Sequence, residues 1–81
     1  MNHPPLLPLE FLGTGEWADV AEVTGEPSLV GRMAELGVRS GSRVQVLRSG
    51  SPCLLEIGGC RLSLRMEFAA QILVRPLAAC G

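Results

Sequence analysis

The side chains that could do chemistry in this chain are three cysteines, one histidine and eight carboxylates. Cys53, Cys60 and Cys80 are odd in number, at spacings that match neither a disulfide framework nor a Cys-x-x-Cys metal knuckle. General acid–base catalysis needs positioned groups with tuned pKa values, usually in a cleft, and the single histidine lies at position 3. The sequence therefore predicts that the protein is not an enzyme and has no catalytic residues.

His3 carries the one specific metal hypothesis. Met1-Asn2-His3 places a free α-amine, two backbone amides and an imidazole in an order that can wrap copper(II) or nickel(II) in a square plane. The alternative, which we favour, is that His3 is a solvated residue of an extended arm. We expect no required cofactor, and zinc or iron held by His3 and surface carboxylates would be adventitious.

Residues 53–57 and 60–65 predict a β-hairpin, because Gly58-Gly59 is a standard two-residue turn. The turn sets five cross-strand pairs, which are Ile57 with Cys60, Glu56 with Arg61, Leu55 with Leu62, Leu54 with Ser63, and Cys53 with Leu64. One face of the hairpin is then entirely apolar, and we expect it to be buried. Glu56 and Arg61 lie on the other face, as opposed charges worth roughly a few tenths of a kcal/mol.

The hairpin register bears directly on the cysteines. Cys53 and Cys60 are both expected on the buried face, separated by about 13 Å at roughly 3.3 Å per residue. That separation excludes a disulfide between them and makes a shared metal ion implausible. We interpret both as small buried residues, and expect Cys80 to be exposed and able to link two molecules.

Two further segments define the first half of the fold. Residues 16–24 predict a strand, with a bulge near Ala21-Glu22 that returns Val23 to the core. A helix of about two turns is expected to start within residues 25–28 and to end before a glycine at position 37. Its apolar residues at helical spacing are expected to pack on the sheet: Leu29, Met33 and Leu36.

Strands over residues 43–47 and 71–75 and a helical turn over residues 66–70 complete the pattern. We predict a mainly β fold, a small barrel of about five strands, with one short helix between the first two strands and the helical turn before the last. Residues 1–8, which contain three prolines, form an extended N-terminal arm. Residues 9–76 form the barrel and residues 77–81 a C-terminal tail.

Composition excludes some partners. The chain has a net charge of −1, no lysine, and seven arginines that occur singly, whereas nucleic-acid binders carry a basic stripe. No apolar run approaches the roughly 18 residues of a membrane span, and no secretion signal is present, so we expect a cytoplasmic protein.

With one tryptophan, two phenylalanines and no tyrosine, the barrel is not expected to bind proline-rich peptides, which need an aromatic groove.

Seven side chains define a candidate surface for a partner protein. They are, in chain order, Trp17, Arg32, Glu35, Arg39, Leu47, Leu54 and Leu73. The apolar members fall on strand faces that point outward by parity, and the charged members lie on or just after the helix. Isolated exposed apolar side chains are also normal, so the alternative is that they form no patch.

Two segments carry a specific combination of residues. Residues 32–41 read R-M-x-E-L-G-V-x-x-G, and residues 64–74 read L-R-x-E-x-A-x-x-I-x-V. Together they resemble the FeoA family, small cytosolic proteins of bacterial ferrous iron uptake with an SH3-like barrel, from about Leu9 to Val74. The proline-rich arm and the cysteine-ended tail depart from the family pattern.

The resemblance implies a regulatory role through protein contact. FeoA-like proteins are thought to act with FeoB, a membrane iron permease that carries a cytosolic GTP-binding domain, so this chain would meet the membrane only through that partner. The same barrel occurs as the C-terminal domain of iron-dependent repressors, which leaves an alternative, a transition-metal (iron or zinc) sensor or carrier. A homodimer, through an exposed hairpin edge or Cys80, also stays open.

Overall fold

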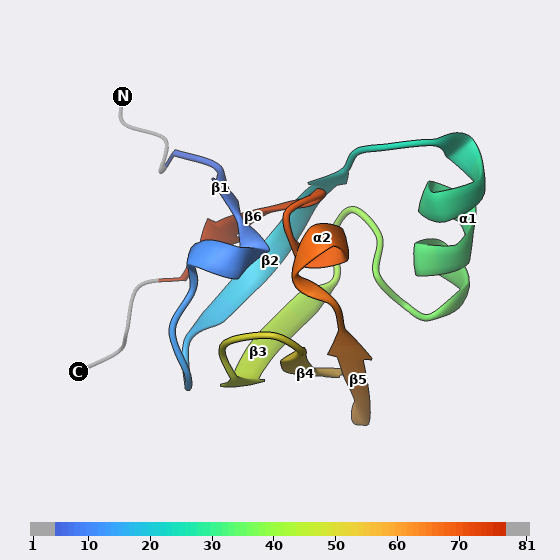
Figure 1. Cartoon of the computed structure of the whole chain (residues 1–81). Coiled ribbons are helices and arrows are strands. Elements are labelled where there is room, and N and C mark those ends of the chain that lie inside the picture. Colours follow the sequence, from blue (N-terminus) through green and yellow to red (C-terminus); the bar gives the residue numbers. More distant parts are fainter. Residues whose placement is uncertain (1–4, 78–81) are drawn as a thin grey trace.

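The computed structural model describes residues 5–77 (Figure 1). Its elements, in chain order, are β1 (Leu7–Pro8), the 3-10 helix η1 (Leu9–Phe11), β2 (Trp17–Val23), α1 (Pro27–Glu35), β3 (Arg43–Arg48), β4 (Cys53–Ile57), β5 (Cys60–Leu64), α2 (Met66–Ala69) and β6 (Ile72–Pro76). Within this range no helix is both long and apolar enough to cross a membrane.

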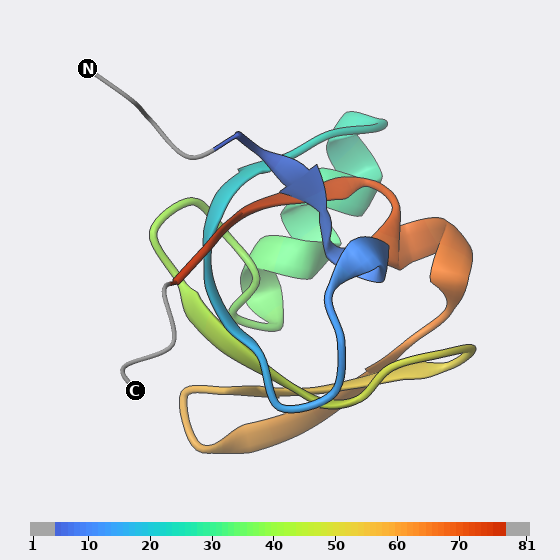
Figure 2. The same ribbon diagram turned by 90° about the vertical axis from the view of Figure 1, so that its left-hand side faces the viewer.

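All strands belong to one antiparallel sheet with the order β1-β6-β2-β3-β4-β5. The sheet curls, so that β6 faces β4 and β5 across the interior, while β2 and β3 join the two sides (Figure 2). The mainly β prediction is confirmed. A sixth, very short strand adds to the expected five, because Leu7 and Pro8 pair with Val74 and Leu73 of β6.

The β4–β5 hairpin has the predicted register at all five pairs. Both turn residues have positive φ, 58° at Gly58 and 84° at Gly59. This backbone is that of a type I′ turn, whose twist matches the twist of the strands that it joins and which favours glycine at both positions.

Bulges bend two of the strands. In β2 the register shifts between Val20 and Glu22, which confirms the predicted bulge, and Val23 packs partly buried against the core. In β3 a second shift lies between Val46 and Arg48, which the sequence did not predict. Such bulges increase the local bend, and β2 needs that bend because it pairs with both β3 and β6.

Helix α1 ends as expected, but Leu36 does not pack on the sheet. Gly37 has φ +96°, and the N–H groups of Gly37 and Val38 donate to the carbonyls of Ala34 and Met33. This pair of bonds is the Schellman motif. It turns the chain so that Val38 is buried and Leu36 is 48% exposed, so the prediction for Leu36 is wrong, while Met33 is buried and Leu29 partly buried.

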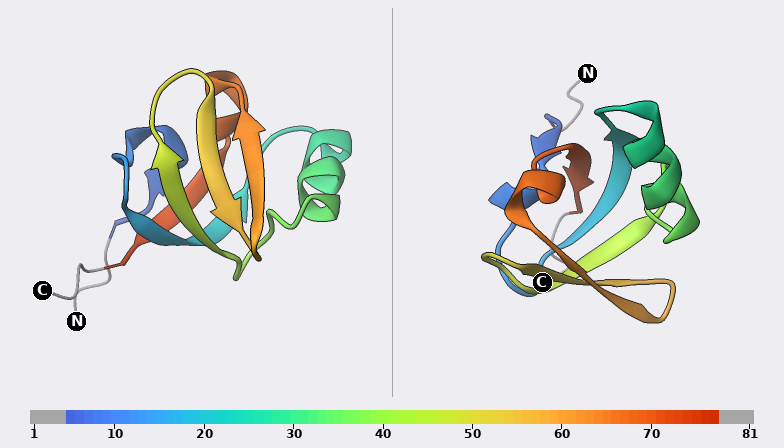
Figure 3. Two further views of the ribbon diagram at one scale, coloured as in Figure 1. Left: turned by 90° about the horizontal axis from the view of Figure 1, so that it is seen from below. Right: turned by 45° about the vertical axis from the view of Figure 1, so that its right-hand side comes forward.

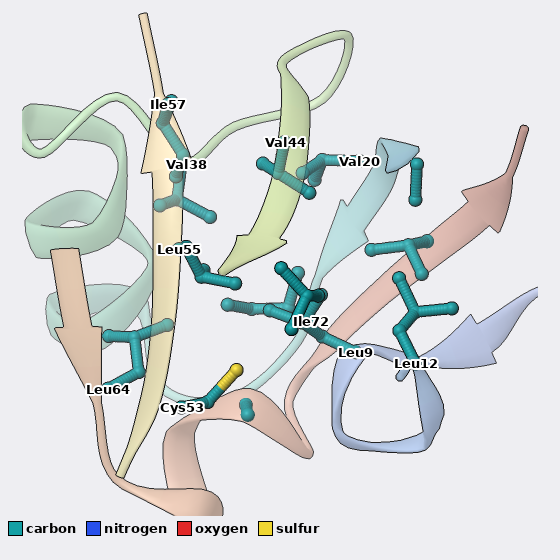
Figure 4. Close-up of a cluster of buried hydrophobic side chains, with 14 of the residues drawn as sticks. Leu9, Leu12, Val20, Val38, Val44, Cys53, Leu55, Ile57, Leu64 and Ile72 are labelled. Atoms are coloured by element: carbon teal, nitrogen blue, oxygen red, sulfur yellow. The ribbon is translucent and has the colours of Figure 1, made fainter. Parts of the chain in front are cut away.

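The core is apolar throughout and draws on every strand except β1 (Figure 4). Its largest fully buried side chains are Leu9, Leu55, Ile72, Val20, Val38, Val44, Val46 and Val74. No buried side-chain N or O atom lacks a hydrogen bond in the described residues. Burial of apolar area is therefore the main force that holds this small sheet closed.

Replacement of Leu55 tests this core. Leu55 is fully buried at the centre of β4, so Leu55→Ala should lower the free energy of unfolding by roughly 2–5 kcal/mol, measured by urea denaturation. Leu36→Ala is the matched control and should cost less than about 0.5 kcal/mol, because that side chain is half in solvent. Equal effects of the two changes would contradict the packing described.

Candidate functional site

The two described cysteines occupy different environments. Cys53 is 3% exposed, as predicted, but Cys60 is exposed, so the prediction that both are buried is wrong. The parity was right, but β5 is the last strand of the sheet. Ile57, which pairs with Cys60, is covered by the end of α1. Gly37, the residue just past this helix, lies so close that a Cβ atom added to it would be 3.5 Å from Ile57 Cγ2. Burial raises the pKa of the Cys53 thiol.

No metal centre forms among the described residues. Residues 5–77 contain no group of three or more His, Cys, Asp or Glu side chains that could hold a metal ion. The predictions for His3 and Cys80 lie outside the described residues.

The structure places the seven candidate surface residues on separate parts of the molecule. Arg32 and Glu35 are exposed on α1, and Arg39 is exposed in the turn before β3. Trp17 is 45% exposed at the start of β2, and the three leucines are half-buried on strand faces. The charged group and the apolar group are therefore separate features.

The three leucines lie in two different places on the sheet. Leu47 is the extra residue of the β3 bulge, beside the pair formed by Arg48 and Leu54. Leu73 instead lies opposite Glu22 at the far end of β2 and next to β1. Leu47, Leu54 and Leu73 therefore do not form one contiguous patch. Leu54 lies next to Leu47, and Leu73 lies apart from both.

A surface pocket lies beside Leu54, and the sequence did not reveal it. It has a volume of about 300 Å³, and its lining residues are Arg48, Ser49, Ser51, Pro52, Leu54 and Ser63. The loop between β3 and β4, residues 49–52, is anchored from outside the pocket, because the backbone N–H of Ser49 donates to Thr14 Oγ1 at 3.0 Å. The pocket lies beside the β3 bulge and this long-range anchor, and neither leaves a local signal in the sequence.

The chemistry of this pocket is cationic and partly apolar. Leu54 and Pro52 supply apolar surface, the serines supply hydroxyl groups, and Arg48 supplies a guanidinium. No lining residue is acidic, and Arg48 has no ion-pair partner within residues 5–77. Such a surface can take an apolar side chain next to a carboxylate.

Elsewhere on the outer face, one ion pair links two strands. Asp19 of β2 accepts hydrogen bonds from Arg43 Nε at 2.9 Å and Arg43 Nη2 at 3.4 Å. The hydrogen bond with Arg43 holds the pKa of Asp19 below its usual value, and the charge of Arg75 adds to the effect. Glu56 and Arg61 face each other in register but form no ion pair, and exposed pairs stabilise little in any case.

The fold and the site together define a small antiparallel barrel with a pocket on its surface beside Leu54. No protein with a curated description matches the chain. The family model for the FeoA domain matches residues 7–76. The chain belongs to the FeoA family, and its link to ferrous iron transport follows from that membership.

Solved structures agree with this assignment. An iron uptake regulatory protein, FeoA, is 27% identical with a TM-score of 0.85, over 90% of this chain and 100% of that one. FeoA of Stenotrophomonas maltophilia, solved with zinc, is 27% identical with a TM-score of 0.72, over 82% of this chain and 86% of that one. It is described as an SH3-domain protein and a candidate activating factor of bacterial ferrous iron transport. The SH3-like fold expected from the sequence is thereby confirmed.

A third similar structure has another role. A manganese-dependent transcriptional repressor in complex with manganese is 25% identical with a TM-score of 0.84, over 91% of this chain but 38% of the repressor. The barrel is thus a module that also occurs within longer metal-responsive proteins.

Thiol reactivity tests the two cysteine environments. In a Cys80→Ser variant, iodoacetamide at pH 8 should modify Cys60 at least about tenfold faster than Cys53, because Cys53 is buried and its raised pKa leaves less thiolate. Peptide mapping over time measures both rates in one sample. Equal rates would show that the edge of the hairpin is covered or that the core is open.

Proposed function

We propose that this chain is an accessory, regulatory protein of bacterial ferrous iron uptake, working in the cytoplasm by contact with the FeoB permease and its GTP-binding domain. It catalyses no reaction in this role and requires no cofactor. Membership of the FeoA family supports the link to iron transport. The pocket beside Leu54 is the observation that supports action by contact.

The pocket favours one side of the molecule for that contact. Leu54 and Leu47 lie together next to Arg48, which has no ion-pair partner within residues 5–77, whereas Leu73 lies at the other end of the sheet. Burial of an apolar anchor in a pocket contributes most of the binding energy at many interfaces. We therefore assign the contact to Leu54 and Arg48, with Arg32, Glu35 and Arg39 on the helical side as secondary candidates.

A metal sensor or carrier is the alternative function. The likeness to a manganese-dependent repressor favours it, and the ligands would have to include residues outside 5–77, or a second chain, because residues 5–77 hold no suitable cluster. A calorimetric titration of the chain alone with zinc or iron(II) distinguishes the two, because a sensor needs a defined site with one stoichiometry.

Matched leucine variants test the proposed contact. The ¹⁵N-labelled chain is titrated with the GTP-binding domain of FeoB, with and without bound nucleotide. Leu54→Glu should weaken binding at least about tenfold, since it buries a charge in the pocket, while Leu73→Glu should leave the affinity within about twofold. Both leucines are half-buried on outer strand faces, so the two changes are closely comparable.

The spectrum of each free variant shows whether it folds. Unchanged binding by a folded Leu54→Glu variant, or equal loss with Leu73→Glu, would refute the assigned surface. Failure of the wild-type chain to bind in any nucleotide state would refute contact with this domain.

A further inference from the structure

The two edges of the sheet are not alike. The edge strand β1 has two residues, and one of them is Pro8, which has no N–H to donate. The other edge strand, β5, has five residues and no proline. Figure 3 shows β3, β4 and β5 side by side, with β5 outermost. Natural proteins usually blunt such edges, and here only β1 is blunted.

Alternate residues of β5 direct their backbone groups away from the sheet. In a hairpin with a two-residue turn, the residues that flank the turn, here Ile57 and Cys60, exchange both hydrogen bonds, and the pattern then alternates. Arg61 and Ser63 therefore direct their N–H and C=O groups outward from β4. Within residues 5–77 these groups take part in no hydrogen bond with another element.

The side chains along this edge are cationic on the outer face. Arg61 and Ser63 are exposed, and Arg65, which follows in extended conformation, shares their parity. Within residues 5–77 neither arginine has an ion-pair partner. On the inner face Leu62 is only half-buried, beside the core, so the edge is cationic outside and apolar inside.

We propose that β5 binds an extended acidic segment of a partner protein, which adds to the sheet as a further strand. Backbone bonds to Arg61 and Ser63 would hold the segment, carboxylates on its outer face would lie near Arg61 and Arg65, and an apolar residue would cover Leu62. The proposal rests on the proposed function only in taking that partner to be the transporter. Ser63 also lines the pocket beside Leu54, so the added strand extends that surface.

A second copy of this chain is a poorer occupant. Antiparallel pairing of two β5 strands around Arg61, Leu62 or Ser63 brings arginines of the two copies opposite or diagonal to each other. Like charges in those positions are destabilising, whereas carboxylates are attracted.

Three blocked hexapeptides test the edge. They are Glu-Val-Glu-Val-Glu-Val, the shuffled Glu-Glu-Glu-Val-Val-Val, and Lys-Val-Lys-Val-Lys-Val. With the ¹⁵N-labelled chain, the first peptide should shift the Arg61 and Ser63 amides and slow their hydrogen exchange at least about fivefold. The shuffled and lysine peptides should not. An equal response to the shuffled peptide, or no response to any, overturns the proposal.

Variants separate backbone pairing from charge. Ser63→Pro removes an outward N–H at an edge, where proline is tolerated, and should abolish the response. Arg61→Glu with Arg65→Glu should reverse the preference toward the lysine peptide, which keeps the test valid if the proline variant does not fold. Arg75→Glu, an exposed arginine on β6, is the control and should change nothing. Amide protection that appears without peptide and rises with protein concentration would instead identify a second copy as the occupant and overturn the proposal.

Titration with the GTP-binding domain of FeoB distinguishes this proposal from the proposed function. Binding of the domain that leaves Arg61 and Ser63 unaffected would overturn the edge proposal alone. Peptide binding at the edge without binding of the domain would support the edge and overturn the proposed partner.

Discussion

Alternation of buried and exposed residues along the strands is the constraint on which this structure depends. In the β4–β5 hairpin, Gly58 and Gly59 adopt positive φ at both positions and so set which residues face inward. A slip of one residue would expose Leu55 and bury Glu56. A small domain buries little apolar surface and cannot lose much of it without unfolding. The turn therefore stabilises the whole domain through the register that it sets, as well as the two strands that it joins.

Strand β2 is the second element that the barrel requires. It pairs with β3 on one side and with β6 on the other, and its bulge allows one strand to bend between those two directions. The sheet is therefore joined in its middle by β2, which connects β6 to β3. Strand β1 forms one edge of the sheet and β5 forms the other. Surface features follow from this closure. The pocket lies beside the β3 bulge and the Thr14–Ser49 contact, and within residues 5–77 no strand pairs with β5 on its outer side, which leaves Arg61 and Ser63 available.

Local features of the fold could be predicted from the sequence. Features that depend on whether an element distant in the sequence packs over a residue could not. The hairpin register, the bulge near Ala21-Glu22 and the helix end at Gly37 each depend on a few adjacent residues. Cys60 and Leu36 have the parity or spacing of core residues, yet within residues 5–77 both are exposed. Of the candidate site, Leu54 was identified through parity, whereas Arg48 and Ser63 were missed because the pocket joins three strands and a loop. The other surface residues remain predictions.

The central claim is that the chain binds its partner through the side that carries β5 and the pocket beside Leu54. Hydrogen–deuterium exchange of the chain, alone and with the detergent-solubilised FeoB transporter, tests this claim most directly. For the free chain we expect slow exchange at the core amides of β2, β3 and β6 and fast exchange at Arg61 and Ser63. The transporter should then slow exchange at those two amides and around Leu54. Unchanged exchange on this side, with protection confined to the end of the sheet that carries Leu73, would contradict the account.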